Sequence, residues 1–184
     1  MPSLDLSAVG RALALVREFC PDPSAFGRFR ELPAAAVPEP AHRLLDHRGH
    51  MTVTMERFHG GPVGLRVVAE RRPAAAGDRY AREILLVRGD GAVVQHGIVR
   101  IDLAALPPPA AAAVLAGREP LGRILIDAGI LCAVQDVRLL EVAVGPHLAA
   151  LLGCRPDAVS HGRVAAIHVD GAAVVELLEI VAPA

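Results

Sequence analysis

The sequence predicts an α+β fold: a single antiparallel sheet, with helices packed mainly on one of its faces. Runs rich in Val, Ile and Leu dominate the chain from residue 50 onward, and two Asp-Gly turns, Arg88–Gly91 and Val169–Gly171, each separate a pair of such runs. Glycine accepts the positive φ of a tight hairpin turn, so the flanking strands are expected to pair antiparallel. The elements show no βαβ alternation, and a parallel sheet is therefore not predicted.

The first forty residues predict one helix followed by an irregular, proline-rich connector. The helix covers Ala8–Phe19, where charged residues interrupt the apolar ones in an amphipathic pattern. Prolines then recur up to Pro40 at spacings that neither a helix nor a central strand tolerates. We therefore expect residues 1–40 to form this N-terminal segment and residues 41–184 to form the sheet domain, the two making one compact unit.

Beyond the connector, strand-like and helical patterns follow one another along the chain. The β-branched and apolar runs predict strands at Met51–Phe58, Val63–Arg72, Tyr80–Val87, Ala92–Ile101, Leu131–Val144, Arg163–Val169 and Ala173–Val181. A helix is predicted at Pro107–Gly117, because prolines occupy its first turn and glycine follows its end. Two shorter helices are predicted at Leu121–Gly129 and Pro146–Leu152.

The charge balance and the composition exclude several function classes. Nineteen Lys and Arg residues oppose twenty Asp and Glu residues, so the formal charge is −1 and no net basic field attracts nucleic acid. All nineteen cations are arginine, which rules out lysine Schiff-base chemistry and a P-loop lysine. Aromatic residues make up only 3% of the chain, which leaves little material for stacking on bases. We therefore predict no nucleic-acid partner.

The chain lacks the sequence signals of a membrane or secreted protein. No uncharged apolar run reaches the ~18 residues that a membrane span needs, and the first apolar stretch is not a signal peptide. Cys20, Cys132 and Cys154 show no C-x-x-C spacing, so neither a disulfide framework nor a zinc knuckle is predicted. The sequence thus predicts a cytoplasmic protein with no membrane partner.

A group of histidines suggests a metal site at first sight. The group lies in one short stretch with two carboxylates and consists of His42, His47, His50 and His59 near Asp46 and Glu56. A metal site needs ligands that converge. The sequence becomes strand-like after Gly49, so the histidines before and after it cannot share one helical face. The H-E-x-x-H pattern is also absent. We therefore expect solvated or core-edge histidines, and no metal.

Two charged residues lie in runs that are otherwise apolar. The period of two places Arg82 on one strand face with Ile84 and Leu86, and it aligns Glu179 with Leu177. A buried guanidinium needs an anion, so Arg82 either pairs with a glutamate in a structural salt bridge or contributes to an anion-binding cavity.

The spacing also separates two glutamates of the last strand. Glu176 points away from the face of Glu179 unless a bulge intervenes. The sequence leaves open which of the two faces a cavity.

The chain resembles the chorismate lyase family, and in particular its actinobacterial-type branch, over residues 44–183. The resemblance rests on segments in a fixed order: Leu44-Leu45 with His50-Met51-Thr52, Tyr80 to Leu86, Pro120 to Leu125, His161-Gly162-Arg163, and a last strand with Glu179 and Pro183. At His161, relatives usually carry an aromatic residue.

The resemblance implies a chorismate lyase-like fold, in which a single antiparallel sheet of about six strands and its helices enclose a buried ligand cavity. It also implies an activity. The activity is that of a carbon-oxygen lyase of aromatic biosynthesis, which eliminates pyruvate from chorismate to give 4-hydroxybenzoate without a cofactor. The implied catalytic residues are Arg82, which binds the ring carboxylate, and Glu179, which accepts the proton. Those implied to bind the substrate are Arg82, Met51, Thr52, Leu121, Gly122 and Arg163, with Arg123 as an alternative to Arg163 for the second carboxylate.

Two other functions fit the same residues. One is a lyase-like enzyme of secondary metabolism that acts on a related cyclic acid. The other is a non-catalytic module that binds an aromatic acid, as the ligand-sensing domains of some transcription regulators do. We expect the regulator to be disfavoured, because residues 1–40 show one helix and no helix-turn-helix. A small molecule is the expected partner, and the sequence leaves the oligomeric state open.

Overall fold

Seven antiparallel strands form one sheet in the computed structural model, which describes residues 7–75 and 77–183. Residues 1–6 and 184, the outer ends of the predicted segments 1–40 and 41–184, lie outside the described residues, as does residue 76. The sheet order is β1-β5-β6-β7-β4-β3-β2. The strands are β1 (Gly27–Leu32), β2 (Val63–Arg71), β3 (Tyr80–Arg88), β4 (Val93–Ile101), β5 (Cys132–Val144), β6 (Val159–Val169) and β7 (Ala172–Val181). The predicted α+β class with a single antiparallel sheet is confirmed, with seven strands in place of the six or so that the resemblance implies.

Both Asp-Gly turns join antiparallel neighbours, as predicted. The first connects β3 to β4, and the second connects β6 to β7. In the second turn Asp170 has φ 50° and Gly171 has φ 82°. Two consecutive positive φ values match the right-handed twist of the flanking strands, which explains why Asp-Gly occurs here.

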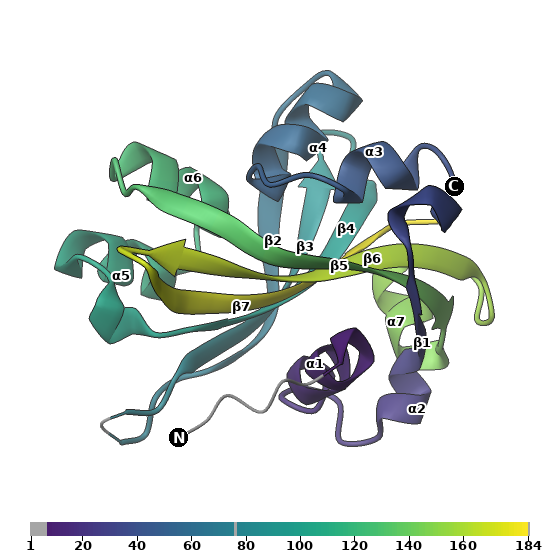
Figure 1. The fold of residues 1–184 in the computed structure, drawn as a ribbon, viewed down its shortest axis with the longest axis horizontal. Helices are drawn as coiled ribbons and strands as arrows, with labels where there is room; N and C mark the ends of the chain where they lie inside the picture. The colour runs from purple at the N-terminus through teal and green to yellow at the C-terminus, as the bar shows by residue number, and fades with distance from the viewer. Residues whose placement is uncertain (1–6, 76, 184) are drawn as a thin grey trace.

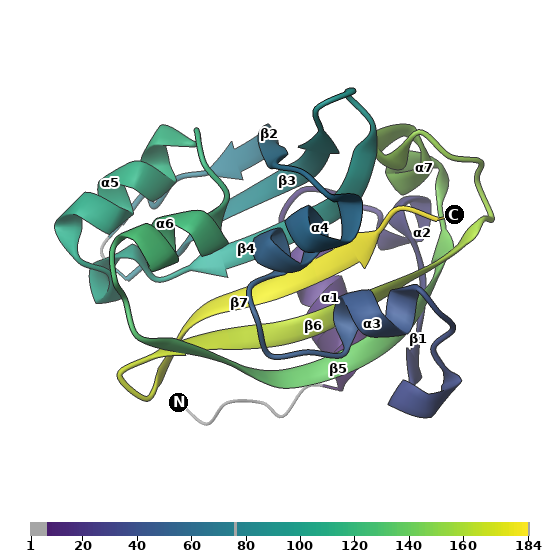
Figure 2. The same cartoon turned by 90° about the horizontal axis from the view of Figure 1, so that it is seen from above.

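Helices cover both faces of the sheet, so the prediction of helices mainly on one face is wrong (Figures 1 and 2). One face carries α1 (Ala8–Val16), α2 (Pro23–Phe26) and α7 (Pro146–Leu152). The other carries α3 (Ala41–Leu45), α4 (Met51–His59), α5 (Pro108–Ala116) and α6 (Leu121–Asp127). Short 3-10 turns occupy Ala34–Ala36 and Leu103–Ala105. Within residues 7–75 and 77–183, no helix has the length and apolar character needed to cross a membrane.

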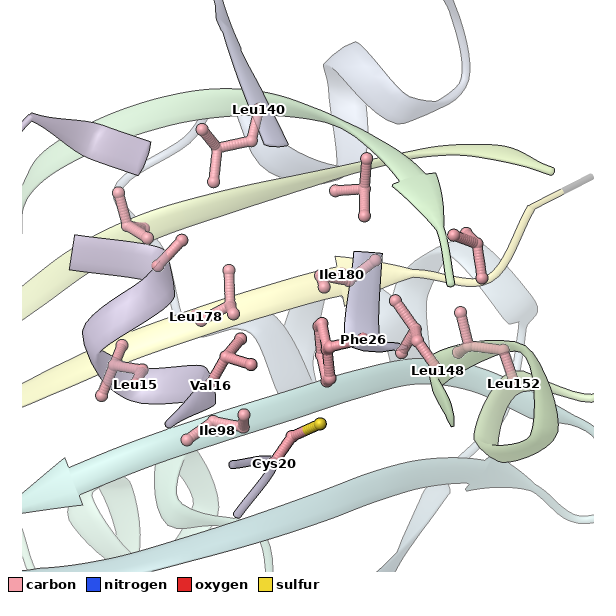
Figure 3. Packing of buried hydrophobic residues seen from close by; sticks show 14 of the residues in the cluster. Leu15, Val16, Cys20, Phe26, Ile98, Leu140, Leu148, Leu152, Leu178 and Ile180 are labelled. Atoms are coloured by element: carbon pink, nitrogen blue, oxygen red, sulfur yellow. The ribbon is translucent and has the colours of Figure 1, made fainter. Parts of the chain in front are cut away.

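Side chains alternate between the two faces of the sheet along the central strands, so each face has its own hydrophobic core. On the face under α1, α2 and α7, Leu178 and Ile180 of β7 pack with Ile98 of β4 against Phe26 and the helices (Figure 3). On the other face, odd-numbered residues of β7 such as Leu177 pack under α5 and α6. Two buried faces explain why most of these strands are apolar throughout.

The segment Met51–His59 is a helix, α4, and its predicted strand is wrong. The run of Thr52, Val53 and Thr54 favours a strand by local propensity alone. However, Met51, Thr52 and Met55 are the buried residues, and this i, i+1, i+4 spacing is helical. Tertiary burial of the two methionines outweighs the propensity of the β-branched residues.

The N-terminal connector contains an edge strand, β1, that the sequence analysis did not predict. β1 pairs with β5, and its charged residues bind across the pair: Arg30 Nη2 lies 2.8 Å from Glu141, and Arg138 Nε lies 2.7 Å from Glu31. These partners lie more than 100 residues away in sequence, so local composition could not reveal them. Residues 27–32 therefore form part of the sheet.

Gly145, at the start of α7, packs too closely against α2 to tolerate a side chain. A Cβ atom here would lie 2.4 Å from Ala25 O and 2.7 Å from Phe26 C, both backbone atoms that cannot swing away. We expect Gly145→Ala to lower the free energy of unfolding by about 3 kcal/mol in urea titrations. Gly61→Ala is the matched control, because a Cβ at Gly61 meets nothing within 4 Å. A Gly145→Ala protein as stable as this control would contradict the packing.

Candidate functional site

A cavity of about 50 Å³ lies between the central sheet and the helices α4 and α6. Figure 2 shows α4 and α6 over β4 and β7, with β3 beside them. Its walls are mainly apolar, with a few polar groups. The lining residues are His50, Met51, Thr52, Leu65, Arg82, Ile84, Leu86, Gln95, Gly97, Val99, Pro120, Leu121, Gly122, Val134, Ile167, Leu177 and Glu179.

Strand alternation and register build the floor of the cavity. Gly97 of β4 lies between Ile84 of β3 and Glu179 of β7, and the next cavity-facing row contains Arg82, Val99 and Leu177. A Cβ at Gly97 would lie 3.2 Å from Ile84 Cδ1, so the absence of a side chain keeps the floor open between Arg82 and Glu179.

Arg82 is a buried cation to which no carboxylate of the described residues binds. Its residue is 1% exposed, its Nη1 donates to Val114 O at 3.3 Å, and its Nε has no hydrogen-bond partner in the described part of the chain. Glu70 lies opposite on β2, but its carboxylate binds Arg72 at 2.8 Å and the Tyr80 hydroxyl at 3.0 Å. Burial lowers the pKa of Arg82, and nearby Tyr80 and Glu70 partly offset this. A guanidinium nevertheless stays protonated in proteins, so Arg82 presents a positive charge.

Glu179 lines the cavity as an ion-paired carboxylate. Its Oε2 accepts from Arg163 Nε at 2.7 Å, across the β6–β7 pair. Arg163 is itself buried and does not line the cavity, and its Nη1 donates to Leu45 O at 3.2 Å and to His47 O at 2.8 Å. The charge of Glu179 is therefore balanced inside the protein before any ligand binds.

Glu176 lies on the opposite face of β7. It pairs with Arg79 at 3.0 Å and with Arg100. No bulge realigns the two glutamates, because the β4–β7 register is continuous from Val175 to Val181. The odd spacing alone decides that Glu179 faces the cavity and Glu176 does not.

Two polar residues of the cavity were missed as ligand-binding candidates. Gln95 is buried on β4, and its Oε1 has no partner in the described residues. The signal was a glutamine inside an apolar strand. His50 was a candidate only as a metal ligand; it lines the cavity, and its Nε2 lies 3.5 Å from Cys132 Sγ. Burial lowers the pKa of His50, which favours the neutral imidazole.

Four further residues that were predicted to bind the substrate line the cavity. Met51, Thr52, Leu121 and Gly122 all line it, at the N-terminal ends of α4 and α6. Their roles toward a ligand stay predictions.

The remaining arginine and histidine candidates lie elsewhere. Arg123 binds Glu56 at 2.7 Å outside the cavity, and His161 faces Glu141 across the β5–β6 pair. His42 lies 3.3 Å from Asp46, whereas His47 accepts a hydrogen bond from the Gly49 amide at 3.1 Å.

A second polar group lies behind the cavity, on the other face of the same strands. His96 of β4 and Glu83 of β3 are buried, and His96 Nε2 lies 2.8 Å from Glu83 Oε1. His147 Nε2 of α7 lies 3.9 Å from the same oxygen. Burial lowers the pKa of His96, although Glu83 acts in the opposite direction.

Acidification should destabilise the protein through its buried histidines. Burial lowers the pKa values of His47, His50 and His96 from the ordinary value of 6.5. Below pH 6.5 the unfolded chain therefore binds protons that the folded chain does not, and stability falls as the pH decreases. We expect the urea midpoint to drop steadily from pH 7 to pH 5, and less steeply in His96→Gln. A midpoint that rises on acidification would contradict this.

Comparison with known proteins identifies the fold but no family. The sequence matches no family model and no curated protein. The structure is similar to the effector domain of PhnF from Mycobacterium smegmatis, with TM-score 0.57 and 16% identity over 73% of this chain and 88% of that one. It is also similar to the ligand-binding domain of a putative GntR-family transcriptional regulator from Bordetella bronchiseptica, with TM-score 0.51 and 17% identity over 65% of this chain and 85% of that one.

A third similar structure is PhnF from Mycobacterium smegmatis, with TM-score 0.54 and 17% identity over 74% of this chain and 65% of that one. The chain has the chorismate lyase-like fold of these effector domains. At these identities the likeness establishes the fold alone.

The predicted chorismate pyruvate-lyase activity is wrong, and with it the classification as a carbon-oxygen lyase. The similar solved structures carry effector and ligand-binding domains of regulators rather than lyases. The site geometry gives a physical reason, since the proposed proton acceptor Glu179 is bound to the guanidinium of Arg163. Glu179 Oε2 already accepts a hydrogen bond from Arg163 Nε at 2.7 Å, so this oxygen is engaged inside the protein before any substrate binds. The fold resemblance was sound, but the chemistry does not follow from it.

Proposed function

We propose that this chain is a non-catalytic ligand-binding domain of the transcription-regulator type, which binds a small cyclic or aromatic acid. The observation that carries the proposal is Arg82, a buried guanidinium whose Nε has no partner in the described residues and which borders an apolar cavity. Burying a cation without an anion costs free energy, and a ligand carboxylate supplies the missing partner bidentately.

The rest of the cavity supports an acid with a ring. Between Arg82 and the polar end at Glu179 the walls are aliphatic, with Ile84, Val99 and Leu177 among them. Such walls suit a flat apolar body whose orientation is set by a few polar groups. The likeness to regulator effector domains also supports binding without turnover. The sequence alone favours the lyase activity over this ligand-binding function.

The test uses 4-hydroxybenzoate as a probe in isothermal titration calorimetry, together with a turnover assay on chorismate. We expect saturable binding of one 4-hydroxybenzoate per chain and no release of pyruvate from chorismate. The control compound is 4-hydroxybenzyl alcohol, which has the same ring and hydroxyl but no carboxylate and should not bind. Absence of 4-hydroxybenzoate binding up to millimolar concentration, or pyruvate release, would overturn the proposal.

The division at residue 40, the cytoplasmic location and the absence of cofactors and of nucleic-acid partners stay predictions.

A further inference from the structure

Cys132 and His50 form a side-chain pair that the proposed function does not use. Cys132 Sγ lies 3.5 Å from His50 Nε2, within hydrogen-bonding distance for sulfur. The pair joins the first residue of β5 to the residue that precedes α4. His50 lines the cavity, and Cys132 is partly buried against the apolar cluster under α5 and α6. A thiol beside an imidazole is an arrangement by which proteins activate a cysteine.

A close approach between α4 and α6 fixes the position of His50. A Cβ atom at Gly122 of α6 would lie 3.1 Å from His50 Cβ and 3.3 Å from Thr52 Oγ1. The absence of a side chain at Gly122 therefore makes room for the start of α4. In this position the imidazole borders both the cavity and the thiol.

Burial keeps both members of the pair uncharged. It raises the pKa of the Cys132 thiol. It also lowers the pKa of His50, on which the Glu179 carboxylate and the Arg163 guanidinium act in opposite directions. Near pH 7 the thiol therefore keeps its proton, and the neutral imidazole can accept it. A buried thiol is inert by itself, so the reactivity of Cys132 depends on this base.

The cavity that His50 lines also contains polar atoms without partners. Gln95 Oε1 and Arg82 Nε belong to buried side chains, and neither atom has a hydrogen-bond partner in the described residues. Buried polar atoms are normally paired. These two atoms, among apolar walls, independently indicate that a molecule with a polar group and an apolar body binds beside His50.

We propose that Cys132 and His50 form a covalent capture site for small α,β-unsaturated carbonyl compounds. This activity goes beyond the proposed binding of an acid and does not depend on it. An addition reaction fits the neutral pair, because the proton that the imidazole accepts is the proton that the product needs.

The reaction is a conjugate addition that needs no other reactant. The S–H bond of Cys132 breaks and its proton passes to His50 Nε2, while the sulfur forms a bond to the β-carbon of the ligand. The electron pair of the C=C double bond moves toward the carbonyl group and gives an enolate. The proton then passes from Nε2 to the α-carbon. The products are a thioether on Cys132 and a neutral imidazole.

The experiment measures alkylation of the native chain by methyl vinyl ketone at pH 7.5, with each adduct located by peptide mass spectrometry. Cys154 is the internal control: it is also partly buried, burial also raises its pKa, and no histidine among the described residues activates it. We expect Cys132 to react at least about tenfold faster than Cys154. His50→Gln should remove this advantage. His59→Gln, at the other end of α4 and outside the cavity, should retain it.

Misfolding of a variant cannot imitate the expected result. A loosened fold exposes Cys132 and raises its rate, whereas loss of the base lowers it. An unchanged or faster reaction of Cys132 in His50→Gln would overturn the proposal, as would a parent protein in which Cys132 reacts no faster than Cys154. These rates do not depend on 4-hydroxybenzoate binding, so the failure of the capture site and the failure of the proposed function are separate results.

Discussion

Replacing Arg82 by methionine should abolish acid binding and at the same time stabilise the protein. Methionine fills a similar volume and lacks the guanidinium, so the affinity for 4-hydroxybenzoate should fall at least 100-fold in calorimetry. The unliganded protein should gain about 1–3 kcal/mol in free energy of unfolding, because the substitution removes a buried cation that has no carboxylate partner among the described residues. Loss of function combined with gain of stability is typical of a residue retained for binding.

The control for this prediction is Arg66→Met. Arg66 is an exposed residue of the neighbouring strand β2, and its replacement should change neither quantity by much. If Arg82→Met unfolds more easily than the parent and still binds 4-hydroxybenzoate, Arg82 is a structural residue. The bond to Val114 O would then be its main role.

Replacing Arg163 by methionine should have the largest effect on stability. The substitution leaves the Glu179 carboxylate and the carbonyls of Leu45 and His47 without their donor inside the protein. Breaking one side of a buried ion pair costs about 3–5 kcal/mol, and urea titrations should show a loss of this size. The segment between α3 and α4 should also lose amide-exchange protection, because Arg163 donates hydrogen bonds to the carbonyls of Leu45 and His47.

Two further variants make the Arg163 prediction specific. The double variant Arg163→Met, Glu179→Met removes both charges, and it should be more stable than Arg163→Met alone. Arg138→Met breaks the exposed ion pair with Glu31 at the sheet edge. Its free energy of unfolding should fall by less than about 1 kcal/mol. Similar losses in Arg138→Met and Arg163→Met would contradict a special role for the buried pair.

The fold class could be predicted because its signals are local. The alternation of β3, β4 and β7 lies within single runs of the chain, and Asp170-Gly171 specifies a tight turn by its own backbone preferences. The same alternation predicts that Arg82 and Glu179 lie on apolar strand faces, and both residues do. A charged residue at such a position conflicts with burial, and this conflict is visible in the sequence.

The function could not be predicted in the same way, because it depends on what surrounds each charge. The resemblance implies that Glu179 accepts a proton, but the β6–β7 register places Arg163 beside it. The ion pair fixes the position of the Glu179 carboxylate and balances its charge. The resemblance to lyases concerns the fold, and a shared fold does not fix the chemistry.

By itself, the sequence determined most of the strands, the hairpin turns and the two charged residues of the cavity, because neighbouring residues set backbone alternation and turn geometry. Only the tertiary structure decided that Met51–His59 is a helix, that residues 27–32 extend the sheet, and that helices cover both faces. It also decided that Arg163 balances Glu179, whereas Arg82 has no carboxylate partner among the described residues. These features depend on contacts between residues far apart in the chain, and their energies appear in no local pattern.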